Sequence, residues 1–270
     1  MSIVTYETLQ CELHQGVGLI WLNRPEVRNA MNDVMLAELA QALDAALSDD
    51  EVRMVLLAGR GKAFCAGGDL EWMKRARNMT KDEARADSGK LATVLRMLHD
   101  SPKPTVARVH GSAFAGGMGL LAACDIAIAS ADTRFCLSEV KLGLIPAMIS
   151  PYVMKAIGER HARRYFLSAE VFEAAEAWRI GLVHNIVPED ELDGAVNALL
   201  GQLLAAGPQA LGHCKRLIAD VAGKPITDDL IAETAQRIAE VRASDEAQEG
   251  IAAFFEKRSP AWLASLDASA

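Results

Sequence analysis

The sequence lacks the features of a membrane-spanning, secreted or disulfide-linked chain. No segment holds about 18 apolar residues in succession, so we expect no transmembrane helix. Residues 1–7 have no basic stretch followed by an apolar run, so we expect no signal peptide. None of the five cysteines forms a C-x-x-C pair, and such an odd, scattered set is typical of buried free thiols in a reducing compartment: Cys11, Cys65, Cys124, Cys136 and Cys214. We therefore expect a cytoplasmic protein.

Positive charge is also scarce. The 28 lysines and arginines are outnumbered by 36 aspartates and glutamates, which gives a net charge of −8. A nucleic acid or an anionic membrane is therefore not expected as the main partner, and an RNA-binding role is disfavoured for the same reason. The negative total still permits a local basic pocket for an anionic ligand.

Two common kinds of catalytic motif are missing. None of the six histidines lies four residues from another on one predicted helix, and no H-x-H pairs with cysteine, so we expect no metal site. The G-x-S-x-G elbow of a serine hydrolase is absent. We interpret Ser112 and Ser150 as turn or wall residues and not as nucleophiles.

The order of predicted elements indicates an α/β fold. A hairpin turns at Gln15-Gly16, a helix over 33–48 is capped by Asn32, and residues 75–90 are predicted to form a mobile loop that leads into a helix over 90–99. Strand, turn and helix recur, which favours right-handed crossovers. The predicted strands are 9–13, 17–22, 52–58, 105–109, 126–129 and 133–137.

Helical patterns dominate the later part of the chain. They cover 174–180, 191–206, 208–221 and 228–243. We predict a core over residues 1–200 and a helical region over 201–270. Because no linker rich in Gly and Ser separates the two parts, we expect them to pack together.

Two small-residue turns carry the strongest chemical signal. Ala63–Leu70 and Ala113–Gly119 each follow a predicted strand and open a helix. Turns without bulky side chains admit a ligand close to the backbone, and helix N-termini carry unpaired N–H groups. Two such turns facing each other would clamp a carbonyl oxygen between two N–H donors. This oxyanion hole indicates chemistry on an activated acyl group.

Three other patterns each have a plainer alternative. Gly117-x-Gly119-x-x-Ala122 matches a dinucleotide fingerprint, but its acidic partner Glu139 lies beyond a further strand, so NAD binding is disfavoured. Glu139 ends an apolar run and would be desolvated enough for proton transfer, although the pattern alone slightly favours a helix cap. Two short segments carry basic residues that could form a small basic patch, but their pattern alone favours solvated surface charges: Arg24, Arg28, Lys257 and Arg258.

Taken together, the motifs resemble the crotonase family of enoyl-CoA hydratases and isomerases over about Gly18–Trp262, nearly the whole chain. The matching segments are Leu22–Pro25 with Asn29-Ala30, Phe64–Leu70, His110–Gly117, Ala123–Ile126, Ser138-Glu139, Leu142–Pro146, Ala175–Val183 and Phe254–Arg258. The resemblance implies a spiral of ββα units with a C-terminal helical region that forms a homotrimer or, as a dimer of trimers, a homohexamer.

The resemblance also implies an acyl-CoA thioester as substrate, with CoA carried as part of it and no separate cofactor. Gly68 and Gly116 would donate the two oxyanion N–H groups, and Glu139 would be the general acid/base. The CoA contacts would come from Val27, Arg28, Ala30, Ala66, Asp69, Leu70 and Lys257, the last near the phosphates and from another subunit. The acyl pocket would be lined by Gly119, Ile145, Met148 and Ile149.

Two departures bear on the reaction. Well-known hydratases carry a second glutamate where this chain has Gly119, which we expect to leave room for a branched acyl group or an extra water. The segment Ile145–Tyr152 with Ala156–Arg160 resembles bacterial methylglutaconyl-CoA and isohexenylglutaconyl-CoA hydratases of leucine and terpene degradation. We therefore predict hydration of a branched or glutaconyl-type enoyl-CoA. The alternatives are a Δ3,Δ2-enoyl-CoA isomerase with one glutamate, a CoA-thioester hydrolase, and a catalytically weak assembly protein that binds CoA.

Overall fold

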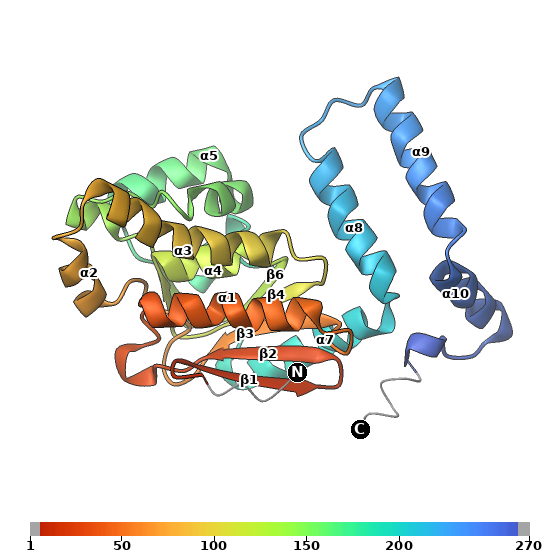
Figure 1. Ribbon diagram of the computed structural model, residues 1–270, viewed down its shortest axis with the longest axis horizontal. Coiled ribbons are helices and arrows are strands. Elements are labelled where there is room, and N and C mark those ends of the chain that lie inside the picture. The colour runs from red at the N-terminus through yellow and green to blue at the C-terminus, as the bar shows by residue number, and fades with distance from the viewer. Residues whose placement is uncertain (1–5, 264–270) are drawn as a thin grey trace.

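The computed structural model describes residues 6–263, whose core is a six-stranded sheet (Figure 1). The strand order is β1-β2-β3-β4-β6-β9. Only the β1–β2 hairpin pair is antiparallel in this sheet, and the other four pairs are parallel. The strands are β1 (Leu9–His14), β2 (Val17–Leu22), β3 (Met54–Gly59), β4 (Thr105–Val109), β6 (Ile126–Ser130) and β9 (Asn185–Val187).

Both faces of this sheet are covered by helices, so its central strands are apolar on both sides. In β3, Val55 and Leu57 point into the larger core, whereas Met54 and Leu56 point into a second cluster with α7 (Leu192–Ala205). The larger core contains the buried stripes of α1 (Asp33–Ser48) and α3 (Lys81–His99), which lie over one face in Figure 1. The alternation follows from the two-residue period of a strand.

A smaller three-stranded sheet has the order β5-β7-β8. Its strands are β5 (Ser112–Phe114), β7 (Arg134–Cys136) and β8 (Phe172–Glu173). The remaining helices of the core are α2 (Leu70–Ala76), α4 (Gly116–Ala123), α5 (Ser150–Ser168) and α6 (Ala174–Arg179), with short 3₁₀ turns η1 (Pro25–Val27), η2 (Glu139–Leu142) and η3 (Glu189–Glu191). This mixed α/β architecture, with mostly parallel strands and C-terminal helices, confirms the predicted α/β fold class.

Local signals in the sequence placed several elements correctly. The hairpin turns at Gln15-Gly16, and the Asn32 side chain accepts a hydrogen bond from the Met35 amide at 2.9 Å to cap α1. The predicted loop over residues 75–90 is wrong, because α3 begins at Lys81. A capping box explains this start: the Glu83 amide donates to the Thr80 hydroxyl at 3.3 Å, and the Thr80 amide donates to the Glu83 carboxylate at 2.7 Å.

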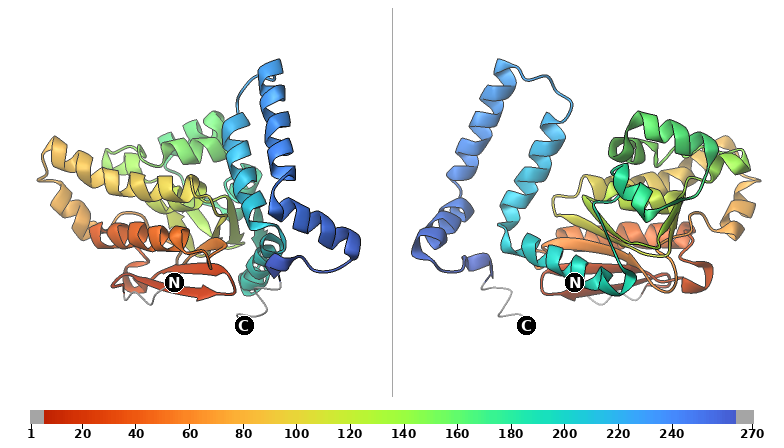
Figure 2. Two further views of the ribbon diagram at one scale, coloured as in Figure 1. Left: turned by 45° about the vertical axis from the view of Figure 1, so that its right-hand side comes forward. Right: turned by 180° about the vertical axis from the view of Figure 1, so that it is seen from behind.

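The last three helices form an arm that extends away from the core (Figures 1 and 2). They are α8 (Pro208–Val221), α9 (Asp228–Arg242) and α10 (Asp245–Glu256). The expectation that this region packs onto the core is therefore wrong for most of its length. The predicted domain boundary at residue 200 falls inside α7, whose buried side chains pack on the sheet.

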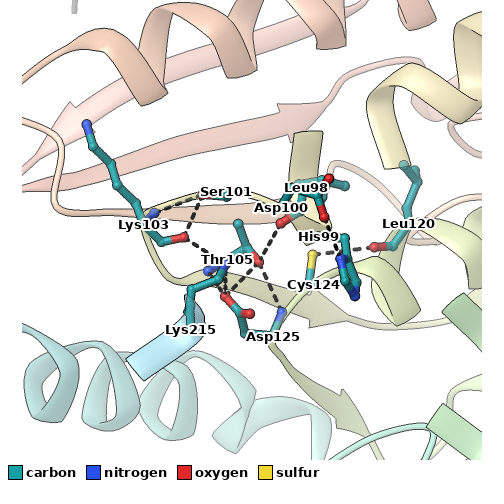
Figure 3. Close-up of polar contacts among 10 residues, drawn as sticks. All are labelled: Leu98, His99, Asp100, Ser101, Lys103, Thr105, Leu120, Cys124, Asp125 and Lys215. Carbon is teal, nitrogen blue, oxygen red and sulfur yellow. Dashed lines mark hydrogen bonds and ion pairs between the residues drawn. The ribbon is translucent and has the colours of Figure 1, made fainter. Parts of the chain in front are cut away.

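One ion pair joins the arm to the core (Figure 3). The Lys215 ammonium on α8 donates to Asp125 Oδ2 at 2.6 Å and to the Lys103 carbonyl at 3.1 Å. The same Asp125 oxygen accepts from the Thr105 amide at 2.7 Å. Thr105 begins β4, and Asp125 directly precedes β6. The Asp125 carboxylate therefore ties α8 to the ends of these two strands.

A second set of contacts holds the hinge between α7 and α8. Arg53 donates to the Ala206 carbonyl at 2.7 Å and to the Trp262 carbonyl at 3.1 Å. Glu246 on α10 accepts hydrogen bonds from the first amides of α8, those of Gln209 and Ala210, at 2.9 and 2.8 Å. A carboxylate at a helix N-terminus is stabilised by the unpaired N–H groups there. The arm therefore has a defined direction at its base.

Residues 6–263 also bear on the expectations about membrane-spanning helices and cysteines. No helix in that range has the length and apolar character needed to cross a membrane. All five cysteines are free; Cys65, Cys124 and Cys136 are buried as expected, whereas Cys11 is half-buried and Cys214 is exposed.

Candidate active site

Backbone pairing brings the two small-residue turns side by side. Parallel bridges join Met31 to Gly68 and Cys65 to Ala113. Next to them, β5 pairs in parallel with β7 in the register Phe114 to Cys136. Segments that are far apart in the sequence therefore form neighbouring extended stretches, and all of them end at the same edge because they run in parallel.

The first donor is the amide of Gly68. The Gly67 carbonyl, which belongs to the same peptide unit, accepts a hydrogen bond from the Met31 amide at 2.8 Å. Because C=O and N–H of a trans peptide point in opposite directions, the Gly68 N–H points away from Met31. Within the described part of the chain this N–H has no acceptor.

The second donor is the amide of Gly116, the first residue of α4. The Ala115 carbonyl accepts from the Met118 and Gly119 amides at 2.9 and 3.3 Å, which starts the helix. By the same peptide geometry, the Gly116 N–H points outward from the helix N-terminus. It too has no acceptor among residues 6–263. Two oriented, unpaired amides thus lie on adjacent turns.

Side chains are excluded at this second turn by close packing. A Cβ on Gly116 would lie 2.4 Å from the Met31 Cε, and a Cβ on Gly117 would lie 2.6 Å from the Cys65 carbonyl oxygen. The contact at Gly117 is with backbone, which cannot move aside cheaply. Glycine is therefore required at position 117 by the close approach of the two turns, whereas at position 116 the contact is with the flexible end of the Met31 side chain.

Glu139 lies just beyond β7, the strand that pairs with β5 beside the second turn. It opens η2 three residues beyond Cys136, whose carbonyl accepts from the Ala115 amide at 2.8 Å. Its Oε2 is buried and has no hydrogen-bond partner among the described residues. Burial raises the pKa of this carboxyl above its ordinary value. The carboxylate also accepts a hydrogen bond from its own backbone amide, which lowers the pKa by less than burial raises it.

A buried carboxylate oxygen without a partner is costly and calls for an explanation. Its raised pKa brings the group closer to neutral pH, where a general acid/base is most effective. The two small-residue turns supply one amide each, from Gly68 and Gly116, to stabilise negative charge on an oxygen. Chemically, this arrangement can move a proton next to a carbonyl while the carbonyl oxygen carries the developing charge.

The room that we expected at Gly119 is filled. A Cβ at Gly119 would lie 2.1 Å from Cγ2 and 2.8 Å from Cβ of Ile149, which is 2% exposed. The expectation of an open space is therefore wrong in this structure, because Ile149 packs against the bare backbone of α4. Of the other predicted pocket residues, Met148 is half-buried and packs against the core, and Ile145 is 74% exposed.

The predicted CoA segment lies directly beside the first turn. The Ala66 amide donates to the Arg28 carbonyl at 2.9 Å. Val27 and Arg28 are exposed, whereas Ala30 is buried. Leu70, at the start of α2, is 73% exposed. The exposed members leave a surface open beside the oxyanion turn.

Arg24 and Asp69 have structural partners. Arg24 Nη1 donates to Asp69 Oδ2 at 2.9 Å and to the Ala30 carbonyl at 2.5 Å, so it is not the solvated charge that its pattern suggested. Asp69 Oδ1 accepts from the Glu71 and Trp72 amides and caps α2. Burial opposes ionisation of Asp69, but these hydrogen bonds and Arg24 outweigh it and lower the carboxyl pKa. The Asp69 side chain is thus committed to fixing the turn.

Lys257 and Arg258 do not join this site within one chain. They lie just after α10 on the arm, at the opposite end of the molecule from η1 (Figure 1). Arg258 pairs with Glu249 at 2.6 Å and with Glu256 at 2.6 Å, whereas Lys257 is exposed. The structure therefore separates Lys257 from Arg28, and a shared phosphate site needs a second copy of the chain.

Sequence reasoning missed two residues that shape the turns. Cys65 accepts a hydrogen bond from the Gly67 amide on its sulfur, and burial raises the thiol pKa to about 12, so the thiol stays neutral. Ala115 adopts a positive φ of 47°. Nothing in the composition signals either role, although both lie inside the small-residue motifs. Between Tyr6 and Leu263, no cluster of three or more His, Cys, Asp or Glu side chains could hold a metal ion.

Comparison with known proteins identifies the group to which this arrangement belongs. The sequence profile of the family described as enoyl-CoA hydratase/isomerase matches residues 12–265. A Thermus thermophilus protein named as an enoyl-CoA hydratase is 38% identical over 245 residues, which cover 90% of this chain and 96% of the relative.

Two solved structures agree along almost the whole chain. A Legionella pneumophila structure described as an enoyl-CoA hydratase/isomerase (crotonase) is 47% identical with a TM-score of 0.92, and the match covers 94% of this chain and 98% of the other. An enoyl-CoA hydratase from Shewanella pealeana is 43% identical with a TM-score of 0.92, and the match covers 95% and 96%.

Proposed function

The chain belongs to the enoyl-CoA hydratase/isomerase family, and on this premise we propose that it hydrates a branched or glutaconyl-type enoyl-CoA with Glu139 as its single acid/base. The observation that carries the proposal is the buried Glu139 Oε2, which has no hydrogen-bond partner among the described residues. Glu139 follows β7, which is paired beside the turns that hold the unpaired amides of Gly68 and Gly116. A family enzyme that acts on enoyl-CoA thioesters needs both parts.

The proposed step uses these groups in one sequence. The ionised Glu139 takes a proton from water as the water oxygen bonds to C3 of the enoyl group. The π electrons move toward the thioester, and the resulting enolate oxygen is held by the amides of Gly68 and Gly116. The protonated Glu139 then gives its proton to C2. Water is thus added across the double bond, and the carboxylate is regenerated.

The branched or glutaconyl acyl group is proposed from the acyl-side segment. Residues 145–152 resemble those of methylglutaconyl-CoA and isohexenylglutaconyl-CoA hydratases, and they supply Ile149 against Gly119. Next to them, Leu142, Leu144 and Ile145 are exposed apolar side chains. An exposed apolar rim of this kind suits the hydrocarbon part of a substrate. A place in leucine or terpene degradation would follow from that acyl group.

A second candidate is supported by Gly119 itself. With no carboxylate at this position, the site holds one acid/base, and moving a proton along an allylic system needs only one. A Δ3,Δ2-enoyl-CoA isomerase would use Glu139 and the same two amides. The heavy-oxygen test below separates the two reactions.

We also propose that the enzyme works as a homotrimer or homohexamer that binds CoA between subunits. The arm exposes large apolar side chains, which a monomer would leave in water: Ile226, Ile231, Ile238, Ile251, Phe254 and Phe255. In such an assembly, Lys257 of a neighbouring copy would approach the CoA phosphates beside Arg28. This arrangement would give a protein of net charge −8 a local basic site for an anion.

The experiment is a panel of straight, branched and glutaconyl-type enoyl-CoA thioesters incubated in heavy-oxygen water. Mass spectrometry of the products separates the candidates. Heavy oxygen on the acyl chain is expected, with a branched or glutaconyl-type substrate turned over fastest. A shifted double bond without heavy oxygen would identify an isomerase, and free CoA would identify a hydrolase. Equal or faster turnover of straight chains would overturn the proposed acyl class.

A further inference from the structure

Ala115 has a backbone conformation that an alanine rarely adopts. Its φ is 47° and its ψ is −119°, close to the first central position of a type II′ turn, where glycine is normally found. Strained residues of this kind persist only where the surrounding structure holds them, and they gather at functional sites. The amide that follows Ala115 is the Gly116 donor.

The methyl group of Ala115 lies beside the bare Cα of Gly67 on the opposite turn. A Cβ built on Gly67 would lie 3.1 Å from the Ala115 Cβ and 3.1 Å from the Phe114 carbonyl oxygen. Gly67 itself has a φ of 95° and has no room for a side chain. Gly67 and Ala115, which directly precede the donor amides of Gly68 and Gly116, therefore lie side by side with no space for a second side chain.

Other contacts hold each side of this junction in place. The Gly67 amide donates to the Cys65 sulfur. Cys65 also packs closely against Gly117, since a Cβ built on Gly117 would lie 2.9 Å from the Cys65 Cβ. The Ala115 amide donates to the Cys136 carbonyl at 2.8 Å. These contacts anchor the Gly67 and Ala115 backbones, one on each side of the junction.

We propose that the Ala115 methyl is a spacer that fixes the separation and orientation of the two oxyanion amides. Ala115 is a positioning residue: it touches no reacting atom and acts through Gly67 and the Gly116 amide. Preformed donors at the correct separation stabilise an oxyanion without reorganisation during the reaction. The inference rests on the proposed function, because it assigns the two amides to the thioester oxygen.

The test compares Ala115→Gly with the wild type. Glycine accepts this backbone conformation without strain, so the variant is expected to fold with equal or higher stability. With the spacer removed, kcat should fall about tenfold or more, whereas the KM for the CoA thioester should change less, because misplaced donors weaken the charged transition state more than the neutral ground state. Ala115→Ser keeps the Cβ and should restore most of the lost kcat.

Ala169→Gly is the matched control. Ala169 is also buried and also has a φ of 47°, but it ends α5 and lies outside both turns. This substitution also removes a buried methyl at a positive φ, although Ala169, with a ψ of 31°, lies in the left-handed helical region and is less strained than Ala115. It should leave kcat near the wild-type value. An equal loss of kcat in this control would overturn the spacer.

A spectroscopic readout distinguishes failure of the spacer from failure of the proposed function. Butyryl-CoA labelled with ¹³C at the thioester carbonyl has no double bond to react. On the wild-type enzyme its carbonyl resonance should move downfield, and its stretching frequency should drop, relative to free butyryl-CoA. No shift on the wild type would overturn the oxyanion site itself. A full shift in Ala115→Gly, with wild-type kcat, would overturn only the spacer.

Discussion

The packing of Ile149 against Gly119 predicts a specific response to a single added methyl group. Gly119 lies in the interior of α4, where alanine normally stabilises a helix by about 0.5–1 kcal/mol relative to glycine. Here the new Cβ would lie 2.1 Å from Ile149 Cγ2, so a buried side chain must shift. Overpacking of this kind costs about 1–3 kcal/mol. We expect Gly119→Ala to lower the free energy of unfolding by about 1 kcal/mol or more once these terms are combined.

A double-mutant cycle isolates the contact. Ile149→Ala alone should cost about 2–5 kcal/mol, as removal of a large buried side chain does. It also removes the Cγ2 that lies nearest the new methyl group. The loss in the double variant should therefore be smaller than the sum of the single losses by about 1 kcal/mol or more.

Urea denaturation followed by circular dichroism measures all four proteins. Gly201→Ala in α7 is the control, since no heavy atom lies within 4 Å of the position of its Cβ. That substitution should be neutral or stabilising. If Gly119→Ala matches this control, or if the two sites show no coupling, then Ile149 does not fill the space at position 119.

Three further predictions concern charge. Burial raises the pKa of Glu139, so ionising it lowers the stability of the folded protein. The stability of Glu139→Gln relative to the wild type should rise as pH increases from the ordinary glutamate pKa to the raised one, and stay constant above it; a difference in unfolding free energy that does not change across a pH series would contradict this. Lys215→Met breaks the 2.6 Å pair with Asp125 and should increase amide exchange in α8 by several fold in exchange mass spectrometry, whereas Arg163→Met, at an exposed pair, should not; unchanged α8 exchange would show that the Lys215–Asp125 pair does not hold α8 to the core. Lys257→Ala should weaken calorimetric CoA binding and flatten its dependence on ionic strength, and unchanged binding would reduce Lys257 to a surface charge.

Local signals in the sequence were enough for much of the fold. Apolar periodicity and the Asn32 cap placed the hairpin and α1, and the family resemblance supplied the ββα spiral. The start of α3 was missed because charge was taken as a sign of a loop, although Thr80 and Glu83 have the spacing of a capping box. The projecting arm was missed because helical periodicity does not indicate what a helix packs against.

At the site, sequence patterns found the turns but not their packing. The small-residue runs indicated two clamping amides, and an apolar run placed Glu139 on a desolvated rim. The identity of residue 119 suggested free space, yet Ile149, thirty residues further along the chain, fills it. The positive φ of Ala115 was equally invisible, because alanine is normally a helix former. Both depend on contacts between distant segments.

The central claim is that Glu139 alone carries the essential proton transfer, and one measurement tests it most directly. Steady-state hydration of the best enoyl-CoA from the panel would be compared between wild type and Glu139→Gln, with butyryl-CoA affinity measured by calorimetry on both. Glutamine keeps the shape of the side chain and removes the acid/base. The account predicts a fall in kcat of about 10²–10⁴ with nearly unchanged affinity. A variant that binds butyryl-CoA normally and keeps most of the wild-type kcat would place the catalytic group elsewhere.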